Sequence, residues 1–385
     1  MFNQQKINGE EPMQQSIRAQ WMKNQNRWQC KVQRDGERKT FTCSTVGRAG
    51  KYQCEDKAAA WLENRSQNKD TKVLLLLDKY IQELQDTSGA GGTAHVQKTS
   101  SISNVWIRPS IGEKRLSDLT EGHLQTILNK AFAKKKLAVK TLSNIRAVMR
   151  SFLKWCRSYG WTTLNPENLK IPRGAEKGTR TILYPNDIEK LFASSETTFG
   201  GKVVQDWHIN RYRFAVATGL RPGEIAGLNR SDVKDGILRV QRSYNTAGEM
   251  TRGKTANAQR TMKLSKLQQS IWDAQMLQLK QAGIVSAVAF PDKKGLRPPQ
   301  QRTAQTWERY RAHNGLSDVT PYELRHTWVS LNKTMPDAYK KAAMGHSKDM
   351  DTNGVYDHAL PDDLKKIADH VDATFNEILN PPKSE

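Results

Sequence analysis

The spacing of apolar side chains changes along the chain, and this change limits the fold more than any other feature. Apolar and polar residues alternate through most of 18–46, which predicts short β-strands. Helical spacing begins in 54–65 and continues, with breaks, through 73–157. Beyond residue 180, helical patterns occur together with one strand pair. No internal repeat is apparent, so the chain is expected to fold as separate, different parts.

The predicted fold class is a multidomain chain with three parts. A small β-sheet with one helix is expected in 1–70, an all-α domain in 71–172, and a mainly helical α+β domain in 173–385. The chain has 385 residues, which is long enough for each part to bury a core of its own. Near the C-terminal end, residues 361–379 predict a last helix with one apolar stripe.

The net charge of +22 indicates a polyanionic partner. The excess of Lys and Arg over Asp and Glu occurs in every part and is largest in 71–180. A disordered basic tail would concentrate this excess at one end. Folded basic parts that follow a long polyanion such as duplex DNA fit better. A membrane surface fits less well, because no amphipathic anchor stands out.

Composition also narrows the location and the chemistry. No apolar run is long enough to cross a bilayer and the first residues lack the apolar core of a signal peptide, so a cytoplasmic location is expected. The four cysteines form no C-x-x-C pair, which favours reduced thiols over a structural zinc site in the first seventy residues. No phosphate-binding Gly-rich loop and no carboxylate cluster spaced for two metals occurs. Neither a metal nor a cofactor is expected.

The stretch ATGLRPGEI predicts an anion site at a helix start. Gly219 is typical of the residue that ends a helix, and Pro222 is typical of the first position of the next one. Arg221 would then lie where free backbone N–H groups and the positive end of the helix dipole attract anions. Glu224, three residues further on, would hold the guanidinium group in place.

The stretch PYELRHT predicts a second arginine on a rigid element. Thr320 and Glu323 have the spacing of a capping box, which indicates that a helix begins here. Tyr322 and Arg325 stand three residues apart and are expected to share one face of that helix. The arginine would then be aimed outward beside a phenol hydroxyl.

Two further stretches carry single candidates. Strand patterns at 237–243 and 260–265 flank a polar loop, which predicts a hairpin with Lys254 near its tip. His346 follows a predicted helix, and Tyr356 lies ten residues further on. Taken alone, each of these residues is more often an ordinary surface or packing residue. The ordered set of motifs is harder to explain in that way.

Taken in order, ATGLRPGEI, RGKT, PYELRHT and MGHS followed by VYDH resemble the motifs of the tyrosine recombinase family. The closest likeness is to integrases of temperate phages and conjugative transposons, which join an arm-binding, a core-binding and a catalytic domain in this order. The resemblance implies a site-specific recombinase that integrates and excises a mobile element. The implied partners are double-stranded DNA at attachment sites, further copies in a homotetramer, and accessory directionality and host DNA-bending factors.

The resemblance also assigns the reaction. The family's nucleophile, two arginines, hairpin lysine and last-motif histidine fall on Tyr356, Arg221, Arg325, Lys254 and His346. One position departs from the family, because Tyr322 stands where a histidine is often found. A phenol donates hydrogen bonds but does not carry protons near neutral pH, so that role would pass to Lys254, His346 or His326.

The expected chemistry explains why cations surround a tyrosine. A phenol with a pKa near 10 is a poor nucleophile until its anion is stabilised. Attack on a phosphodiester adds negative charge to the non-bridging oxygens, which planar guanidinium groups suit better than lysines do. Lys254 would protonate the departing 5′ oxygen. The resulting 3′-phosphotyrosyl link keeps the energy of the broken bond, so rejoining needs no cofactor.

Several alternatives stay open. In the helical domain, Arg146, Arg150 and Lys154 lie off the apolar face of their helix and are candidates for DNA contact. In the family a C-terminal helix often docks on a neighbouring copy, and the stripe in 361–379 fits that role and packing on its own chain about equally well. Two other functions would use the same fold: a type IB topoisomerase-like enzyme, and a DNA-binding regulator without catalysis.

Overall fold

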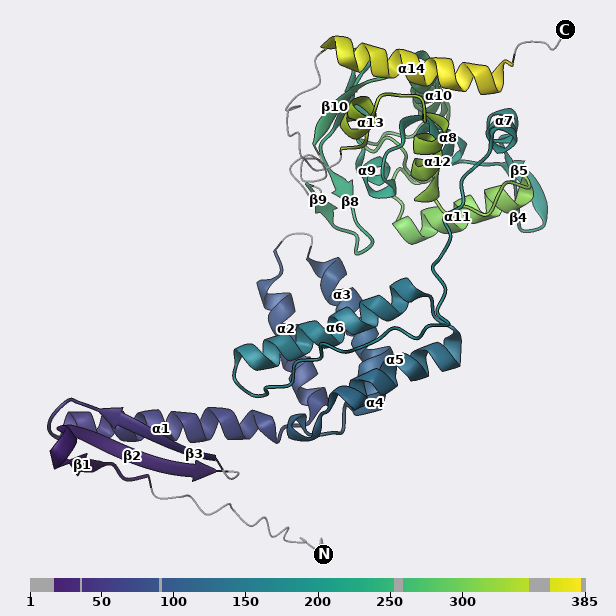
Figure 1. Cartoon of the computed structure of the whole chain (residues 1–385). Helices are drawn as coiled ribbons and strands as arrows, with labels where there is room; N and C mark the ends of the chain where they lie inside the picture. Colours follow the sequence, from purple (N-terminus) through teal and green to yellow (C-terminus); the bar gives the residue numbers. More distant parts are fainter. Residues whose placement is uncertain (1–16, 35–36, 90–91, 253–258, 346–360, 382–385) are drawn as a thin grey trace, which may run out of the picture. The chain divides into compact units, whose positions relative to one another are not determined.

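The structure is a computed structural model whose described residues divide into two compact units (Figure 1). The first unit comprises Met1–Asp86 and Thr99–Lys177, and the second comprises Thr87–Lys98 and Gly178–Glu385. Three separate hydrophobic cores form, one in the N-terminal sheet, one in the following helices and one in the second unit. The predicted multidomain fold class is confirmed, and the exact boundaries stay a prediction. The described residues are 17–34, 37–89, 92–252, 259–345 and 361–381.

The N-terminal part is a three-stranded antiparallel sheet with one helix along it (Figure 1). Its elements are β1 (Gln20–Met22), η1 (Lys23–Gln25), β2 (Arg27–Arg34), β3 (Glu37–Cys43) and α1 (Arg48–Lys69). Alternation along β2 turns Cys30 and Val32 into the core, where they meet Cys54 and Ala58 of α1. The cysteines are free thiols. Among the described residues, no group of three or more side chains is arranged to ligate a metal ion.

The middle part is helical, as predicted. Its elements are α2 (Val73–Thr87), α3 (Thr93–Ile102), η2 (Ser103–Ile107), α4 (Arg108–Ile111), η3 (Leu116–Asp118), α5 (Glu121–Lys135) and α6 (Val139–Ser158). Helix α6 buries Leu142, Ile145 and Phe152 at helical spacing, because its apolar residues form one stripe. The helices over 93–111 were not predicted, since the Gly/Ser-rich sequence that precedes them indicates a break in helical structure.

The second unit combines helices with short strands around α8. Its elements are α7 (Pro185–Ala193), β4 (Glu196–Phe199), β5 (Lys202–Gln205), α8 (Ile209–Thr218), α9 (Pro222–Gly227), η4 (Arg230–Asp232), β6 (Val233–Lys234), β7 (Ile237–Val240), β8 (Ser243–Tyr244), β9 (Met250–Thr251), β10 (Arg260–Lys263), α10 (Lys266–Gln281), α11 (Gln300–His313), α12 (Glu323–Leu331), α13 (Asp337–Met344) and α14 (Pro361–Leu379). Helix α8 packs against α10 and α12, and its Phe214, Val216 and Ala217 are fully buried. Helix α8 therefore forms the centre of this core.

The predicted strand pair is confirmed. Strand β10 runs antiparallel to β7 with Arg260 opposite Val240, and β6 pairs with the other edge of β7. Two further antiparallel pairs were not predicted: β4 pairs with β5, and β8, which begins at the last residue of the predicted strand, pairs with β9 in the loop. Strands of only two residues, such as β8 and β9, carry too little alternation to be recognised in the sequence.

The C-terminal helix α14 packs on its own chain (Figure 1). It lies against α7, α10, α13 and β10, and its Val371 and Phe375 are only 1% exposed. Asp372 caps the start of α10 by accepting hydrogen bonds from the backbone N–H groups of Lys266 (2.7 Å) and Leu267 (3.0 Å). The apolar stripe is thus used within the chain in this structure. No helix among the described residues is long and apolar enough to span a bilayer.

Candidate active site

The turn between α8 and α9 places Arg221 at a helix start, as predicted. Gly219 follows α8 with φ +65°, a left-handed conformation that suits glycine, and Pro222 is the first residue of α9. The carboxylate of Glu224 accepts hydrogen bonds from the Arg221 backbone N–H (3.0 Å) and from Arg221 Nη1 (2.7 Å). About a third of the Arg221 side chain stays exposed. The predicted hold of Glu224 on the guanidinium group is confirmed.

Arg325 lies on α12, but it does not point outward as predicted. It is 2% exposed, and Nη1 donates to the Gly219 carbonyl (2.9 Å) while Nη2 donates to the Met344 carbonyl (2.7 Å). The expected outward direction is wrong because two backbone carbonyls draw the guanidinium group inward. The helix also begins at Glu323, whose Oε2 accepts the Thr320 N–H (2.7 Å), so only this half of the predicted capping box is seen.

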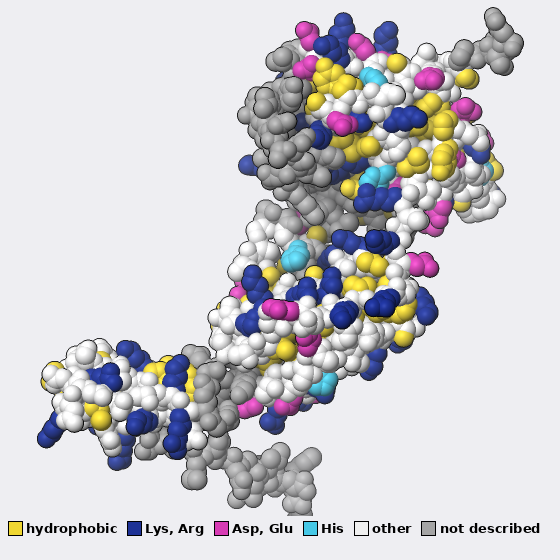
Figure 2. All heavy atoms as spheres, viewed as in Figure 1, with side chains coloured by type: hydrophobic (Ala, Val, Ile, Leu, Met, Phe, Trp, Pro, Cys, Tyr) yellow, Lys and Arg dark blue, Asp and Glu magenta, His cyan; other side chains and the backbone are white. Residues whose placement is uncertain are grey.

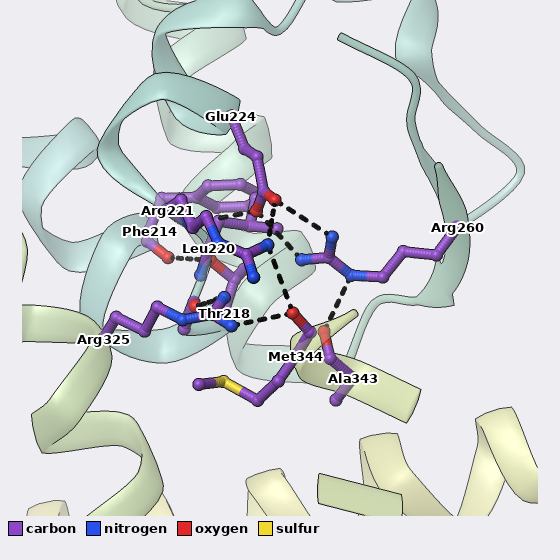
Figure 3. Close-up of polar contacts among 10 residues, drawn as sticks. Phe214, Thr218, Leu220, Arg221, Glu224, Arg260, Arg325, Ala343 and Met344 are labelled. Carbon is purple, nitrogen blue, oxygen red and sulfur yellow. Dashed lines mark hydrogen bonds and ion pairs between the residues drawn. The ribbon is translucent and has the colours of Figure 1, made fainter. Parts of the chain in front are cut away.

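A third arginine, Arg260, completes the cluster and was missed in the sequence. Its Nη1 and Nη2 donate to the two carboxylate oxygens of Glu224 (3.2 and 3.0 Å), and its Nε donates to the Ala343 carbonyl (2.8 Å; Figure 3). Its side chain is 7% exposed. Its position as the first residue of a predicted strand gave no sign of this role.

Burial and charge oppose each other in this cluster. Burial alone would raise the pKa of Glu224, but the charge and hydrogen bonds of Arg260, followed by those of Arg221, lower it instead. Burial, followed by repulsion from Arg221, lowers the pKa of Arg325 to about 10, so it stays charged near neutral pH. Arg221 and Arg260 bind the one carboxylate, and Arg325 adds a third positive charge. The cluster is therefore cationic and suited to an anion.

Tyr322 lies at the surface beside this cluster. It is 48% exposed, and its ring meets that of His326 edge to face, with centroids 5.3 Å apart. Burial, followed by repulsion from Arg180, lowers the pKa of His326, which favours the neutral imidazole. The phenol hydroxyl is thus accessible to a ligand.

The other predicted catalytic residues, Lys254, His346 and Tyr356, lie outside the described residues. The described chain fixes the points that flank them. Helix α13 ends at Met344, followed by Gly345 with φ +61°, and α14 begins at Pro361. Met344, whose carbonyl binds Arg325, therefore stands two residues before His346.

Both arginines that were predicted to contact DNA make hydrogen bonds within the helical part. Arg146 Nη1 donates to the Leu169 carbonyl (3.1 Å), and Arg150 donates to the carbonyls of Pro166 and Glu167 (3.0 and 2.9 Å). They fasten the segment after α6 onto that helix. Lys154 is exposed. Figure 2 shows many Lys and Arg side chains over the visible face of the helical part.

Comparison with known proteins gives consistent matches. Residues 181–362 match the phage integrase family. Over 235 residues the chain is 25% identical to tyrosine recombinase XerC of Herpetosiphon aurantiacus, covering 59% of this chain and 72% of that protein.

Two solved structures share the fold. One is a lambda integrase tetramer bound to a Holliday junction (TM-score 0.59, 18% identity, 88% of this chain and 98% of that chain). The other is the Tn1549 transposon integrase in complex with transposon right end DNA (TM-score 0.59, 17% identity, 77% of this chain and 98% of that chain).

Proposed function

We propose that this chain, a tyrosine recombinase of the phage integrase family, is the integrase of a mobile genetic element. It cuts and rejoins DNA at specific sites through a 3′-phosphotyrosyl intermediate. The proposal rests above all on one observation: Arg221, which precedes α9, and Arg325, in α12, both donate to the Met344 carbonyl (3.5 and 2.7 Å). Two cations are thereby held together at the end of α13, two residues before His346 in the sequence.

Such an arrangement suits phosphoryl transfer. The guanidinium groups of Arg221 and Arg325 repel each other. This repulsion is relieved when an anion binds between or beside them. In the transition state of attack on a phosphodiester, negative charge builds up on the non-bridging oxygens. Positioned guanidinium groups stabilise that charge more than they stabilise the ground state, which is the condition for catalysis.

The steps balance without a cofactor. The phenol oxygen of Tyr356 attacks phosphorus as His346 accepts its proton, and the bond to the 5′ oxygen breaks as Lys254 donates a proton to it. The products are a 3′-phosphotyrosyl ester and a free 5′ hydroxyl. Attack by the 5′ hydroxyl of a partner strand reverses the sequence and releases Tyr356. One phosphodiester is lost and one is formed, so no nucleotide is consumed.

Tyr322 takes part as a hydrogen-bond donor. Its exposed hydroxyl stands on the same segment as Arg325 and would bind a non-bridging phosphate oxygen. Since a phenol does not carry protons near neutral pH, the acid–base steps fall to Lys254 and His346. His326, whose pKa is lowered by burial, stands next to Arg325 in the sequence as a second candidate base.

The proposed partner is double-stranded DNA at paired attachment sites. The net charge of +22 supports this, as do the relatives of the same fold, which include a lambda integrase tetramer on a Holliday junction and Tn1549 integrase on transposon end DNA. Four copies would act together, with accessory directionality and DNA-bending factors. Lys154 would contact the DNA backbone directly, and Arg146 and Arg150 would do so while holding the segment after α6.

The test uses a suicide DNA that carries the element's end and is nicked beside the cleavage position, so that rejoining is impossible. The unaltered chain is expected to form a covalent protein–DNA band on a denaturing gel without added metal, and Tyr356→Phe is expected to form none. Relaxation of supercoiled DNA without paired sites would instead indicate a topoisomerase. A chain that binds the site and forms no band would be a regulator.

A further inference from the structure

Arg260 has no part in the chemistry above. Its guanidinium group nevertheless donates three hydrogen bonds, to Glu224 and to the Ala343 carbonyl. We propose that Arg260 is a positioning residue for strand cleavage, which fixes Glu224, and through it the guanidinium group of Arg221, against the end of α13. The inference rests on the proposed function and adds a residue to it.

The first support is the two-armed contact with Glu224. Arg260 Nη1 and Nη2 reach Oε1 and Oε2 (3.2 and 3.0 Å), while Arg221 uses the same two oxygens through its Nη1 (2.7 Å) and its backbone N–H (3.0 Å; Figure 3). Glu224 is 3% exposed, so its orientation depends on these partners rather than on water. Without Arg260, the carboxylate would keep only the two hydrogen bonds from Arg221 and a single cationic partner, so its orientation would be held less firmly.

The second support is the contact with α13. Arg260 Nε donates to the Ala343 carbonyl (2.8 Å), and the next carbonyl, that of Met344, accepts from Arg325 (2.7 Å). The last carbonyls of a helix carry the negative end of its dipole and lack partners within the helix, so they attract cations. Arg260 and Arg325 thus fasten adjacent carbonyls at the end of α13.

The third support is the rigidity of the Arg260 backbone. It is the first residue of β10 and is paired with Val240 of β7. The planar guanidinium group of Arg260 therefore connects the edge of a sheet to the buried carboxylate of Glu224 and to the end of α13. A lysine has a single ammonium group and no planar fork, so it does not reproduce this geometry.

A matched control exists within the same unit. Arg213 is also a largely buried arginine that holds the end of a helix: its Nε donates to the Leu191 carbonyl (3.0 Å) and its Nη2 to those of Phe192 and Ser194 (2.9 and 3.0 Å). Its hydrogen bonds within the described part of the chain go to these three carbonyls and to Ser195 Oγ (3.2 Å), and none of them involves Glu224 or the three arginines of the site. Replacing either arginine could weaken the fold. Only the replacement of Arg260 should also disturb the position of Glu224 and Arg221.

The experiment compares Arg260→Lys, Arg260→Gln and Arg213→Lys in the full chain. Single-turnover formation of the covalent band on suicide DNA is measured at saturating DNA, together with DNA affinity. We expect both Arg260 variants to cleave about 10- to 100-fold more slowly, the usual loss for a residue that orients a reacting group, with unchanged affinity. Arg213→Lys is expected to stay within about twofold of the unaltered chain.

A second DNA separates positioning from folding. In a methylphosphonate, one non-bridging oxygen at the cleavage position is replaced by methyl, so the group is neutral and needs less cationic stabilisation. The loss caused by the Arg260 variants is expected to shrink on this DNA. The ratio of the two losses does not depend on the folded fraction, so a partly unfolded variant still gives an answer.

Three results would each overturn the inference while leaving the proposed function intact. They are equal losses of cleavage on the two DNAs, a loss in Arg213→Lys as large as in the Arg260 variants, and no loss in the Arg260 variants. No covalent band from the unaltered chain would overturn the proposed function and the inference with it.

Discussion

A Cβ atom at Gly219 would lie 2.8 Å from Cδ2 of Trp328 and 2.9 Å from its Cγ. Trp328 is fully buried on α12, one turn after Arg325, so the ring cannot move aside cheaply. The carbonyl of Gly219 is also an acceptor for Arg325. One backbone position therefore joins the left-handed end of α8, the core and the site.

Gly219→Ala is expected to be strongly destabilising. A side chain in the left-handed region costs about 1–2 kcal/mol, and overpacking against Trp328 adds about 1–3 kcal/mol. Urea unfolding measures the loss. The control is Gly283→Ala, where φ is +66° and nothing lies within 4 Å, so that only the backbone cost applies. Equal losses in the two variants would show that the contact with Trp328 is unimportant.

Glu224→Gln is expected to lower the free energy of unfolding at pH 7 by about 3 kcal/mol, since a buried charge pair is broken. In the folded chain the pKa of Glu224 lies below its ordinary value of 4.5. The carboxylate therefore contributes fully to stability above pH 4.5, and this contribution is lost as the pH falls through the folded pKa. The difference between chain and variant should therefore vanish on acidification. Urea titrations at pH 7, 5 and 3.5 test this.

Asp318→Asn is the control for Glu224→Gln. Asp318 pairs with Arg311 at 2.8 Å, but its side chain is 90% exposed. An exposed pair contributes little, so this variant should lose less than about 0.5 kcal/mol at any of these pH values. A constant difference between Glu224→Gln and the unaltered chain from pH 7 to 3.5 would contradict the assigned pKa direction.

Stability is expected to depend on His208 in mildly acidic solution. Burial, followed by repulsion from Arg211, lowers the pKa of His208 from 6.5 to about 4. The unfolded chain then binds a proton between these values that the folded chain does not bind, so stability falls as pH drops from 6.5 towards 4 and is constant above. His208→Gln should remove this slope in urea titrations, whereas His95→Gln, on exposed His95, should leave it unchanged.

Arg325→Lys should abolish most cleavage. A lysine cannot donate to both the Gly219 and the Met344 carbonyl and present a planar face to phosphate, so we expect a loss of about 100- to 1,000-fold in covalent band formation. DNA affinity should change little. Arg311→Lys, in the ion pair with the exposed Asp318, is the control. Retained activity in Arg325→Lys would place the second arginine elsewhere.

Tyr322 offers a separation of hydroxyl from ring. Tyr322→Phe should leave unfolding unchanged, because the side chain is 48% exposed, and should slow cleavage about tenfold through the loss of one hydrogen bond to phosphate. Tyr322→His should restore cleavage, since imidazole also donates. Equal rates for Tyr and Phe would remove the hydroxyl from the mechanism.

The parts of the site that follow from neighbouring residues could be predicted from the sequence. The end of α8 at Gly219, the start of α9 at Pro222 and the hold of Glu224 on Arg221 all depend on residues within five positions of each other. The pairing of β7 with β10 likewise followed from two alternating stretches.

The rest depends on partners that are distant or have no side chain. Arg260 meets Glu224 across 36 positions, and no local pattern predicts such a pair. The inward turn of Arg325 is set by the carbonyls of Gly219 and Met344, which every residue type possesses. The helices over 93–111 follow a Gly/Ser-rich stretch, and they are stabilised by apolar side chains that pack against distant helices, such as Ile107 and Ile111.

The acceptors that hold the site arginines are largely main-chain atoms, and this has a consequence for how the protein tolerates change. Ala343, Met344 and Gly219 contribute carbonyl oxygens that survive any side-chain replacement which preserves the fold. A scan of side-chain replacements at positions 343 and 344 would therefore report only the effects of side-chain size and packing. It would miss the hydrogen bonds that the two backbone carbonyls accept from Arg260 and Arg325. Only a change in the backbone itself, such as an amide-to-ester replacement that weakens one carbonyl as an acceptor, would expose it.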